Sequence, residues 1–305
     1  RWRARRKQDT PLVRQPGPPK VKPPDFGGLA QDIAQLSHGH DRTQGAGALY
    51  ARHAPSISRR ELQRMVEVAR HDQSAFHRRN LRRIRWNVPN VAWSMDPCEY
   101  KQRDAAGAKV HLNQMQDLAS RYKFIPMTGD VPCGEEISGY LAATFDRFGA
   151  PLFLKRDNGS NLNHAAVNNV LADYFVVPVN SPVHYPPYNG AIEEAQTELK
   201  NGLAAKLAYR PCCPSEHLEA YASTVEHDLN HRPRPCLNGN NACQVYFTGK
   251  RTFTKWERRD AYVWITNLQN DILSSNGVQP QAAWRIAVEA WLRMKGFITV
   301  SINGK

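Results

Sequence analysis

The stretch that most constrains the fold of this chain covers residues 151–200. It opens with the apolar residues 151–154, typical of a buried strand, and then breaks at the turn sequence Asp157-Asn158-Gly159-Ser160. It closes on a helix that carries Glu193 in its first turns, and thirty-five residues lie between Asp157 and Glu193. A carboxylate at a strand's end and another early in a helix are well placed to share a metal ion, while Asn158 and Gly159 shape the turn.

A third acid follows an upstream segment, Val91 to Asp96. Its residues alternate in character, which predicts a strand with Trp93 on one face and Asp96 on the other. Asp117, Asp130 and Asp146 lie outside this pattern, and we expect them at the surface.

These segments resemble the catalytic core of retroviral integrases and of related bacterial insertion-sequence transposases. The matching features are an Asp after a Trp-containing strand, an Asp-Asn-Gly-Ser turn, and an Asn-Gly-x-x-Glu helix, all within about residues 86–247. The resemblance implies a ribonuclease-H-like core: a mixed α/β fold with a mixed sheet flanked by helices. It also implies that Asp96, Asp157 and Glu193 are catalytic and hold two Mg²⁺ or Mn²⁺ ions, with Asp96 bridging both. Two such ions about 3.5–4 Å apart can stabilise the attacking and leaving oxygens of phosphoryl transfer.

Helix geometry distinguishes Glu193 from its neighbour Glu194. At about 100° per residue, one stripe of the helix is apolar and must pack on the sheet; its members are Ile192, Ala195, Leu199 and Leu203. Glu193 lies on the flank of that stripe with Gln196 and Lys200, so we expect it to be the ligand. Glu194 and Glu198 should project toward solvent. Lys200 is a candidate for holding a DNA phosphate, with an ordinary surface lysine as the alternative.

Charge indicates a polyanionic partner. The chain has 41 Lys and Arg against 28 Asp and Glu, a formal net charge of +13. Residues 76–90 hold five arginines and no acid, including Arg82 and Arg83, for which phosphate contact is the expected role. Nucleic acid is the commonest such partner, and a solvated surface is the alternative. No apolar run is long enough to span a membrane, and the six cysteines show no Cys-x-x-Cys spacing, so we expect a cytoplasmic protein with reduced thiols.

The N-terminal region divides into an arm and a helical part. Residues 1–25 are rich in proline and positive charge, which indicates a DNA-tracking arm or a disordered leader. Residues 26–87 predict a helix-turn-helix-like domain followed by a basic connector, with a plain helical bundle as the alternative. A capping box starts the third helix at Ser58, and Arg59 and Arg60 near that end could reach base edges. The pair His38 and His40 is not expected to bind zinc, because no cysteine precedes Cys98.

The rest of the chain is expected to form two regions. A catalytic core covers residues 88–209, and a mainly helical region, which could bind DNA or mediate assembly, covers residues 210–305. In the core we expect two strands between Lys109 and Met127 and a helix from Gly134 to Phe148. After residue 229 the sequence resembles the Asn-x-x-Arg-Pro segment that follows the core in these transposases, although Cys236 stands where relatives usually have His.

These features together predict a DDE-type transposase or integrase. It would cut double-stranded DNA at mobile-element ends and join the exposed 3′-hydroxyl to target DNA, acting as a homo-multimer associated with a bacterial nucleoid. One alternative is a ribonuclease-H-like nuclease that cuts without joining. The other is a domesticated DNA-binding protein whose core is silent.

Overall fold

The computed structural model describes residues 26–34, 46–53, 57–80, 82–182, 186–208 and 215–302. The chain divides into two compact units, the second of which covers residues 84–300. The basic arm of residues 1–25 and the pair His38 and His40 lie outside the described residues.

The described part of the first unit contains three helices, as the periodicity predicts. They are α2 (Phe26–Ala34), α3 (Ala46–His53) and α4 (Arg59–Asn80). They share a small apolar core formed by Leu29, Ile33, Leu49, Ile57, Leu62 and Val66. The Oγ of Ser58 accepts a hydrogen bond from the backbone N–H of Glu61 at 3.2 Å, which is one of the two bonds of the predicted capping box at the start of α4.

The basic connector expected after the third helix is instead regular structure. Helix α4 continues to Asn80, and Arg82 and Arg83 begin the strand β1 (Arg82–Trp86), which pairs with β7 (Ile298–Ile302) in a two-stranded sheet. The strand in this connector was not predicted, because the partner of β1 lies more than two hundred residues away along the chain.

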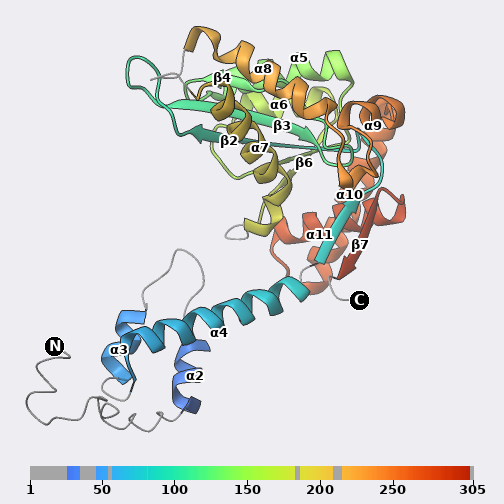
Figure 1. The fold of residues 1–305 in the computed structure, drawn as a ribbon. Coiled ribbons are helices and arrows are strands. Elements are labelled where there is room, and N and C mark those ends of the chain that lie inside the picture. Colours follow the sequence, from blue (N-terminus) through green and yellow to red (C-terminus); the bar gives the residue numbers. More distant parts are fainter. Residues whose placement is uncertain are drawn as a thin grey trace, which may run out of the picture. The chain divides into compact units, whose positions relative to one another are not determined.

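The second unit is built around a five-stranded sheet of order β4-β3-β2-β5-β6 (Figure 1). Its strands are β2 (Ala92–Tyr100), β3 (Val110–Asp117), β4 (Met127–Gly129), β5 (Phe153–Arg156) and β6 (Val177–Asn180). Strands β2, β3 and β4 pair antiparallel, whereas β5 pairs parallel with both β2 and β6. The mixed α/β fold predicted from the sequence is therefore confirmed.

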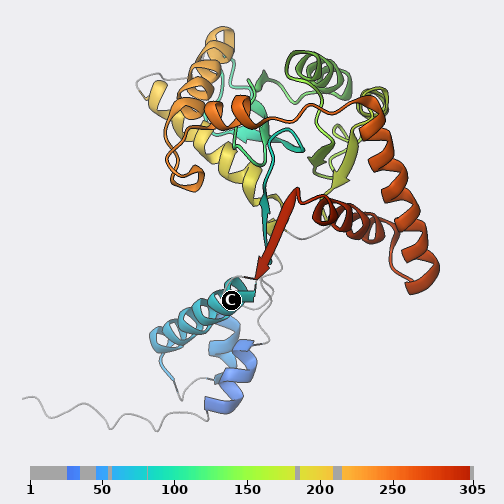
Figure 2. The same cartoon turned by 90° about the vertical axis from the view of Figure 1, so that its right-hand side faces the viewer.

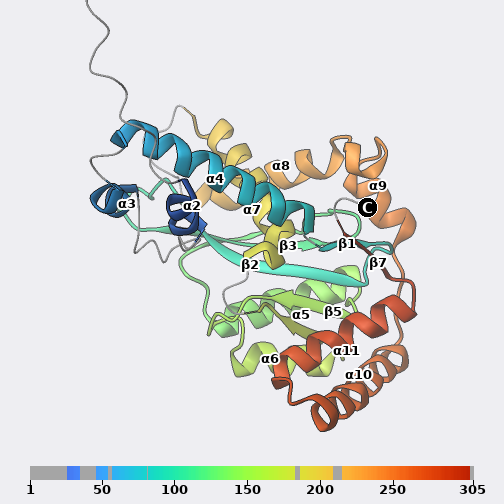
Figure 3. The same cartoon turned by 90° about the horizontal axis from the view of Figure 1, so that it is seen from below.

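Alternating side chains divide the sheet into two buried faces. Trp93 and Met95 pack under α5 (Gly134–Phe148) and α6 (Ala165–Asp173). The opposite face of β2 and β3 is covered by two further helices, α7 (Gly190–Lys206) and α8 (Ser215–His231). Figure 3 shows these two pairs of helices on opposite sides of the sheet.

The helices that follow residue 215 belong to the same compact unit as the sheet. They are α8, then α9 (Ala242–Gly249), α10 (Lys255–Asn276) and α11 (Pro280–Met294), the last two lying side by side in Figure 2. Ile265 of α10 and Trp291 of α11 share a core with Phe153 and Val177 of the sheet. The boundary expected between the catalytic core and the C-terminal region, at residues 209 and 210, therefore falls inside this unit.

Between Lys109 and Met127 the chain forms one full strand rather than two. After β3 it turns, and only Lys123 makes an isolated bridge, to Gln116. The turn is organised by Asp117, which was expected at the surface but is fully buried. Its carboxylate accepts hydrogen bonds from the backbone N–H of Asn90 at 2.7 Å, the N–H of Ser120 at 2.7 Å and the Ser120 hydroxyl at 2.6 Å.

Asp130 and Asp146 are exposed, as expected. No helix within the described part of the chain is long and apolar enough to cross a membrane.

Candidate active site

The register of two neighbouring strands brings Asp96 and Asp157 to one edge of the sheet. Met95 of β2 pairs with Arg156 of β5 in the last position of their parallel ladder, so the two aspartates are the next residues along each chain. Adjacent strands lie about 4.8 Å apart, and side chains two positions apart share a face. Asp96 comes four residues after Ala92, and Asp157 four residues after Phe153. Both aspartates therefore lie on the face of the sheet that α7 and α11 cover. Strand β2 itself continues to Tyr100 against β3, so Asp96 lies within β2, at the end of its pairing with β5.

Helix α7 brings Glu193 close enough for its charge to act on Asp96. The predicted apolar stripe is buried; its members Ile192, Ala195, Leu199 and Leu203 are at most 1% exposed. The stripe fixes the rotation of the helix, which leaves Glu193 exposed on the flank. Glu194 points to solvent with 63% of its side chain exposed, and its nearest cation, Arg121, is 3.8 Å away. We refer to Asp96, Asp157 and Glu193 as the carboxylate site.

Gln196 ties this flank of α7 directly to Asp96. Its side-chain amide donates to the Asp96 backbone carbonyl at 3.0 Å and to Asp96 Oδ2 at 2.9 Å. Two acceptors on one residue fix the amide orientation, because only the NH₂ group can donate to both. The sequence placed Gln196 on the Glu193 flank without assigning it a role; its spacing of three residues from Glu193 was the available signal.

The charges of the site interact. Burial raises the pKa of Asp96 to about 6; the hydrogen bond from Gln196 opposes this rise, the carboxylates of Asp157 and Glu193 add to it, and the charge of Lys200 opposes it. Lys200 therefore lies close enough to act on Asp96, on the flank where the helix phase predicted it.

A second lysine near the site was missed by the sequence reasoning. The Nζ of Lys155 donates to the carbonyl of Tyr188 and lies 3.8 Å from the centre of its ring, just before α7 begins. Burial lowers the pKa of Lys155 to about 8, and the charge of Glu193 acts against that shift. The signal was available, because alternation along β5 puts Lys155 on the same face as Asp157.

The turn after β5 is held from two sides. The backbone N–H of Asn158 donates to Asp157 Oδ1 at 2.7 Å, and the Asn158 amide donates to the carbonyl of Ser181 at 2.8 Å, after β6. At Gly159 an added Cβ would lie 2.9 Å from Asn161 Oδ1, so a larger residue would disturb the turn.

The prediction that Glu198 projects toward solvent is wrong. Only 16% of its side chain is exposed, because it is surrounded by Lys123, Arg232 and Arg234. The remaining basic candidates, Arg59 and Arg60 on α4 and Arg82 and Arg83 on β1, are exposed.

Among the residues that the structure describes, no three His, Cys, Asp or Glu side chains lie close enough as placed to hold a metal ion. The donors of the carboxylate site are nevertheless all oxygens, and the raised pKa of Asp96 reflects in part the repulsion between them. Hard oxygen ligands suit Mg²⁺, which keeps several waters and needs only one or two carboxylates. The residues present therefore fit such an ion.

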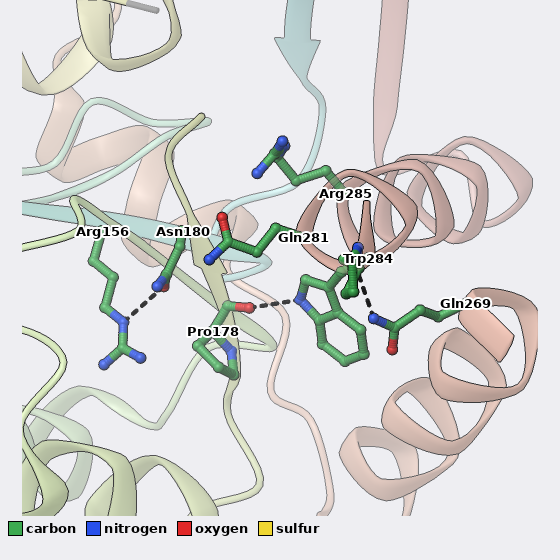
Figure 4. A pocket seen from close by; sticks show the side chains of 8 residues that line it. Arg156, Pro178, Asn180, Gln269, Gln281, Trp284 and Arg285 are labelled. Carbon is green, nitrogen blue, oxygen red and sulfur yellow. Dashed lines mark hydrogen bonds between the residues drawn. The ribbon is translucent and has the colours of Figure 1, made fainter. Parts of the chain in front are cut away.

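A cavity of about 240 Å³ lies between the sheet and the helices α10 and α11 (Figure 4). The Arg156 guanidinium at its wall donates to Asn180 Oδ1 at 3.0 Å, to the Leu162 carbonyl at 2.5 Å and to Asn168 Oδ1 at 2.7 Å. The indole N–H of Trp284 donates to the carbonyl of Pro178 at 2.9 Å. Because these donors are already used within the protein, they have a structural role.

No family model matches the chain, and no curated protein matches it significantly. Among solved structures it is similar to the catalytic core domain of HTLV-2 integrase in complex with magnesium, at 22% identity over 53% of this chain and 99% of that chain, with a TM-score of 0.43. It is also similar to the simian T-cell lymphotropic virus intasome in complex with a PP2A regulatory subunit, at 17% identity over 72% of this chain and 74% of that chain, with a TM-score of 0.46. A further similar structure is the BIV integrase catalytic core, at 18% identity over 52% of this chain and 95% of that chain, with a TM-score of 0.42. Likeness at this level says nothing by itself about the activity, substrates or partners of this chain.

Proposed function

We propose that this chain is a DDE-type transposase or integrase. It cleaves DNA strands at the ends of a mobile element and joins the exposed 3′-hydroxyl to target DNA. The observation that supports the proposal is the register of β2 and β5, which puts Asp96 and Asp157 directly after the last pair of their parallel ladder, while the charge of Glu193 on α7 acts on Asp96. Such a set of carboxylates suits hydrolysis and direct transfer, for which no Ser or Tyr nucleophile is needed.

The carboxylate site would hold Mg²⁺ or Mn²⁺ through Asp96, Asp157 and Glu193, two ions in all. Bound ions of this kind neutralise charge on the attacked phosphate and activate a water or a 3′-hydroxyl in line with the leaving oxygen. Within the chain, Gln196 holds the Asp96 carboxylate in one orientation through its 2.9 Å hydrogen bond. Lys200, close to Asp96 and on the same flank of α7, would bind a phosphate of the DNA strand.

Double-stranded DNA is the proposed partner, at the element ends and at the target. The exposed arginines near the start of α4, Arg59 and Arg60, would read the element end, and Arg82 and Arg83 would contact phosphates. Since two ends must be joined to one target, we propose that the chain acts as a homo-multimer on DNA.

The proposal is tested by two assays with two variants. Nicking of a supercoiled plasmid in Mn²⁺ measures cleavage, and transfer of a labelled oligonucleotide with a free 3′-hydroxyl into that plasmid measures joining. Glu193→Gln should abolish both activities while DNA affinity is retained, and Glu194→Gln should behave like the parent protein. Cleavage without joining would favour the nuclease alternative. Absence of both activities in the parent protein would favour the silent-core alternative.

A further inference from the structure

A second charged cluster surrounds Glu198, five residues after Glu193 on α7. The Nζ of Lys123 lies 2.7 Å from Glu198 Oε2, and two nitrogens of Arg234 donate to the two carboxylate oxygens at 3.0 and 2.9 Å. Lys123 and Arg234 are buried, at 1% and 8% side-chain exposure. Although burial alone would raise it, hydrogen bonds from Arg234 and Lys123 hold the pKa of Glu198 down, at about 2.

The same lysine also reaches the first turn of α7. Its Nζ donates to Gln116 Oε1 at 3.2 Å, and Gln116 Nε2 donates to the carbonyl of Ala191 at 3.0 Å. Ala191 and Glu198 are seven residues apart, or about 10 Å along a helix. One buried ammonium therefore connects to α7 at two points, which restrains both its rotation and its sliding.

The segment after α8 supplies the rest of this cluster. Asn230 exchanges two hydrogen bonds with the backbone of Lys123, at 2.9 and 2.8 Å, and Arg234 donates to the carbonyl of Leu229 at 3.3 Å. Buried ion pairs add little net stability compared with apolar residues of similar size, but their geometry is directional. A bidentate contact between Arg and a carboxylate is the most directional of these.

We propose that Lys123 and Arg234 are positioning residues, which set the rotation of α7 through Glu198 and so hold Glu193 and Gln196 against Asp96. The inference rests on the proposed function and deepens it. A side-chain tip lies about 6 Å from a helix axis, so a rotation of about 10° moves it by about 1 Å. A misplacement of that size can lower a catalytic rate about 100-fold.

The test uses Arg234→Lys, which keeps the charge and removes the two-pronged contact. Its matched control is Lys206→Gln, which breaks an exposed ion pair between α7 and Asp228 of α8. Four quantities are measured on the full chain: the single-turnover rate constant for plasmid nicking at saturating DNA, the DNA affinity, amide hydrogen exchange over residues 191–200, and the urea midpoint. For Arg234→Lys we expect the rate constant to fall 10- to 100-fold, exchange in α7 to accelerate, and DNA affinity to stay within twofold. Lys206→Gln should change neither the rate constant, the exchange rates in α7 nor the DNA affinity by more than about threefold.

A merely structural role would lower the urea midpoint and the reaction amplitude but leave the rate constant of the folded molecules unchanged, and that result overturns the proposal. If Arg234→Lys does not fold, Gln116→Met provides the second variant, since it releases the first turn of α7 and leaves Glu198 paired; the same results are expected and the same ones overturn it. If the parent protein proves inactive, the proposed function fails by itself. Exchange in α7 then decides the positioning role: acceleration confined to α7 in Arg234→Lys, at an unchanged urea midpoint, supports it, and an unchanged pattern or faster exchange throughout the chain overturns it.

Discussion

Gln196 offers the sharpest test of the site, because its role was found only in the structure. The change Gln196→Leu keeps the volume of the side chain and removes both hydrogen bonds to Asp96, at 3.0 and 2.9 Å. The bond to the carboxylate is charge-assisted, and such bonds contribute about 1.5–3 kcal/mol. At 1.36 kcal/mol for each factor of ten, that corresponds to a loss of about 10- to 150-fold. Changing a residue that orients a metal ligand typically lowers metal affinity or activity 10- to 100-fold, which agrees with this range.

The loss should be in chemistry and not in DNA binding, because Gln196 is largely buried against Asp96. We expect the single-turnover rate of plasmid nicking to fall about 10- to 100-fold, with a higher Mg²⁺ concentration needed for half-maximal rate. Gln196→Glu should fall at least as far, because it places a further carboxylate against Asp96. DNA affinity, measured by fluorescence anisotropy without metal, should stay within twofold for both variants.

The control is the next residue along the helix. Thr197 is exposed, and its hydroxyl donates only to the carbonyl of Glu193, at 2.9 Å. Thr197→Val should therefore keep the parent rate. If Gln196→Leu stayed within twofold of the parent, or if Thr197→Val lost as much, the orientation of Asp96 by Gln196 would have no catalytic consequence.

Three further predictions concern DNA contacts and stability. Arg59→Ala should weaken the binding free energy by about 1–3 kcal/mol on the element end only. Arg82→Ala should weaken binding to all duplexes and lower the slope of log affinity against log salt concentration by about one. Binding titrations with the element end and a random duplex at several salt concentrations separate the two. Asp117→Asn should lower the free energy of unfolding by about 2–4 kcal/mol in urea titrations, because one amide oxygen cannot replace a carboxylate facing three donors, whereas the exposed Asp130→Asn should change it by less than about 0.5 kcal/mol. Burial raises the pKa of Glu226 from 4.5 to about 7, so its protonated form favours the folded state; stability should fall as the pH rises from 4.5 to about 7, and less steeply in Glu226→Gln.

The parts of the fold that the sequence predicted well are those specified by local pattern. Helix α5 begins at Gly134 and ends at Phe148, as predicted, because its apolar stripe lies within the segment and Gly149 directly follows it. The strand was predicted from Val91 to Asp96, the residues over which the alternation was traced. It continues to Tyr100, since the antiparallel partner β3 pairs along its whole length. The extent of a strand depends on its neighbour, and the sequence of the strand alone does not contain that neighbour.

Asp117 illustrates the same limit for a single side chain. Nothing in its own sequence neighbourhood distinguishes it from the exposed Asp130, and both lie outside the acidic motif. Its burial depends on Asn90, which is twenty-seven residues away, has a positive φ of 68° and donates its backbone N–H to the carboxylate at 2.7 Å. A buried carboxylate needs such donors, and only the folded chain brings them together.

Glutamates 194 and 198 show where the helix-phase argument stops. They differ by about 40° around α7, so any argument from phase must treat them alike, and both were expected in solvent. Phase gives the direction in which a side chain leaves the helix, and for Glu193 this was enough because the sheet must lie under the apolar stripe. It does not say what lies in that direction. For Glu198 the answer comes from Lys123 and Arg234, far away in sequence on either side of α7, and a carboxylate that was expected in solvent therefore becomes the best-held acid of the helix.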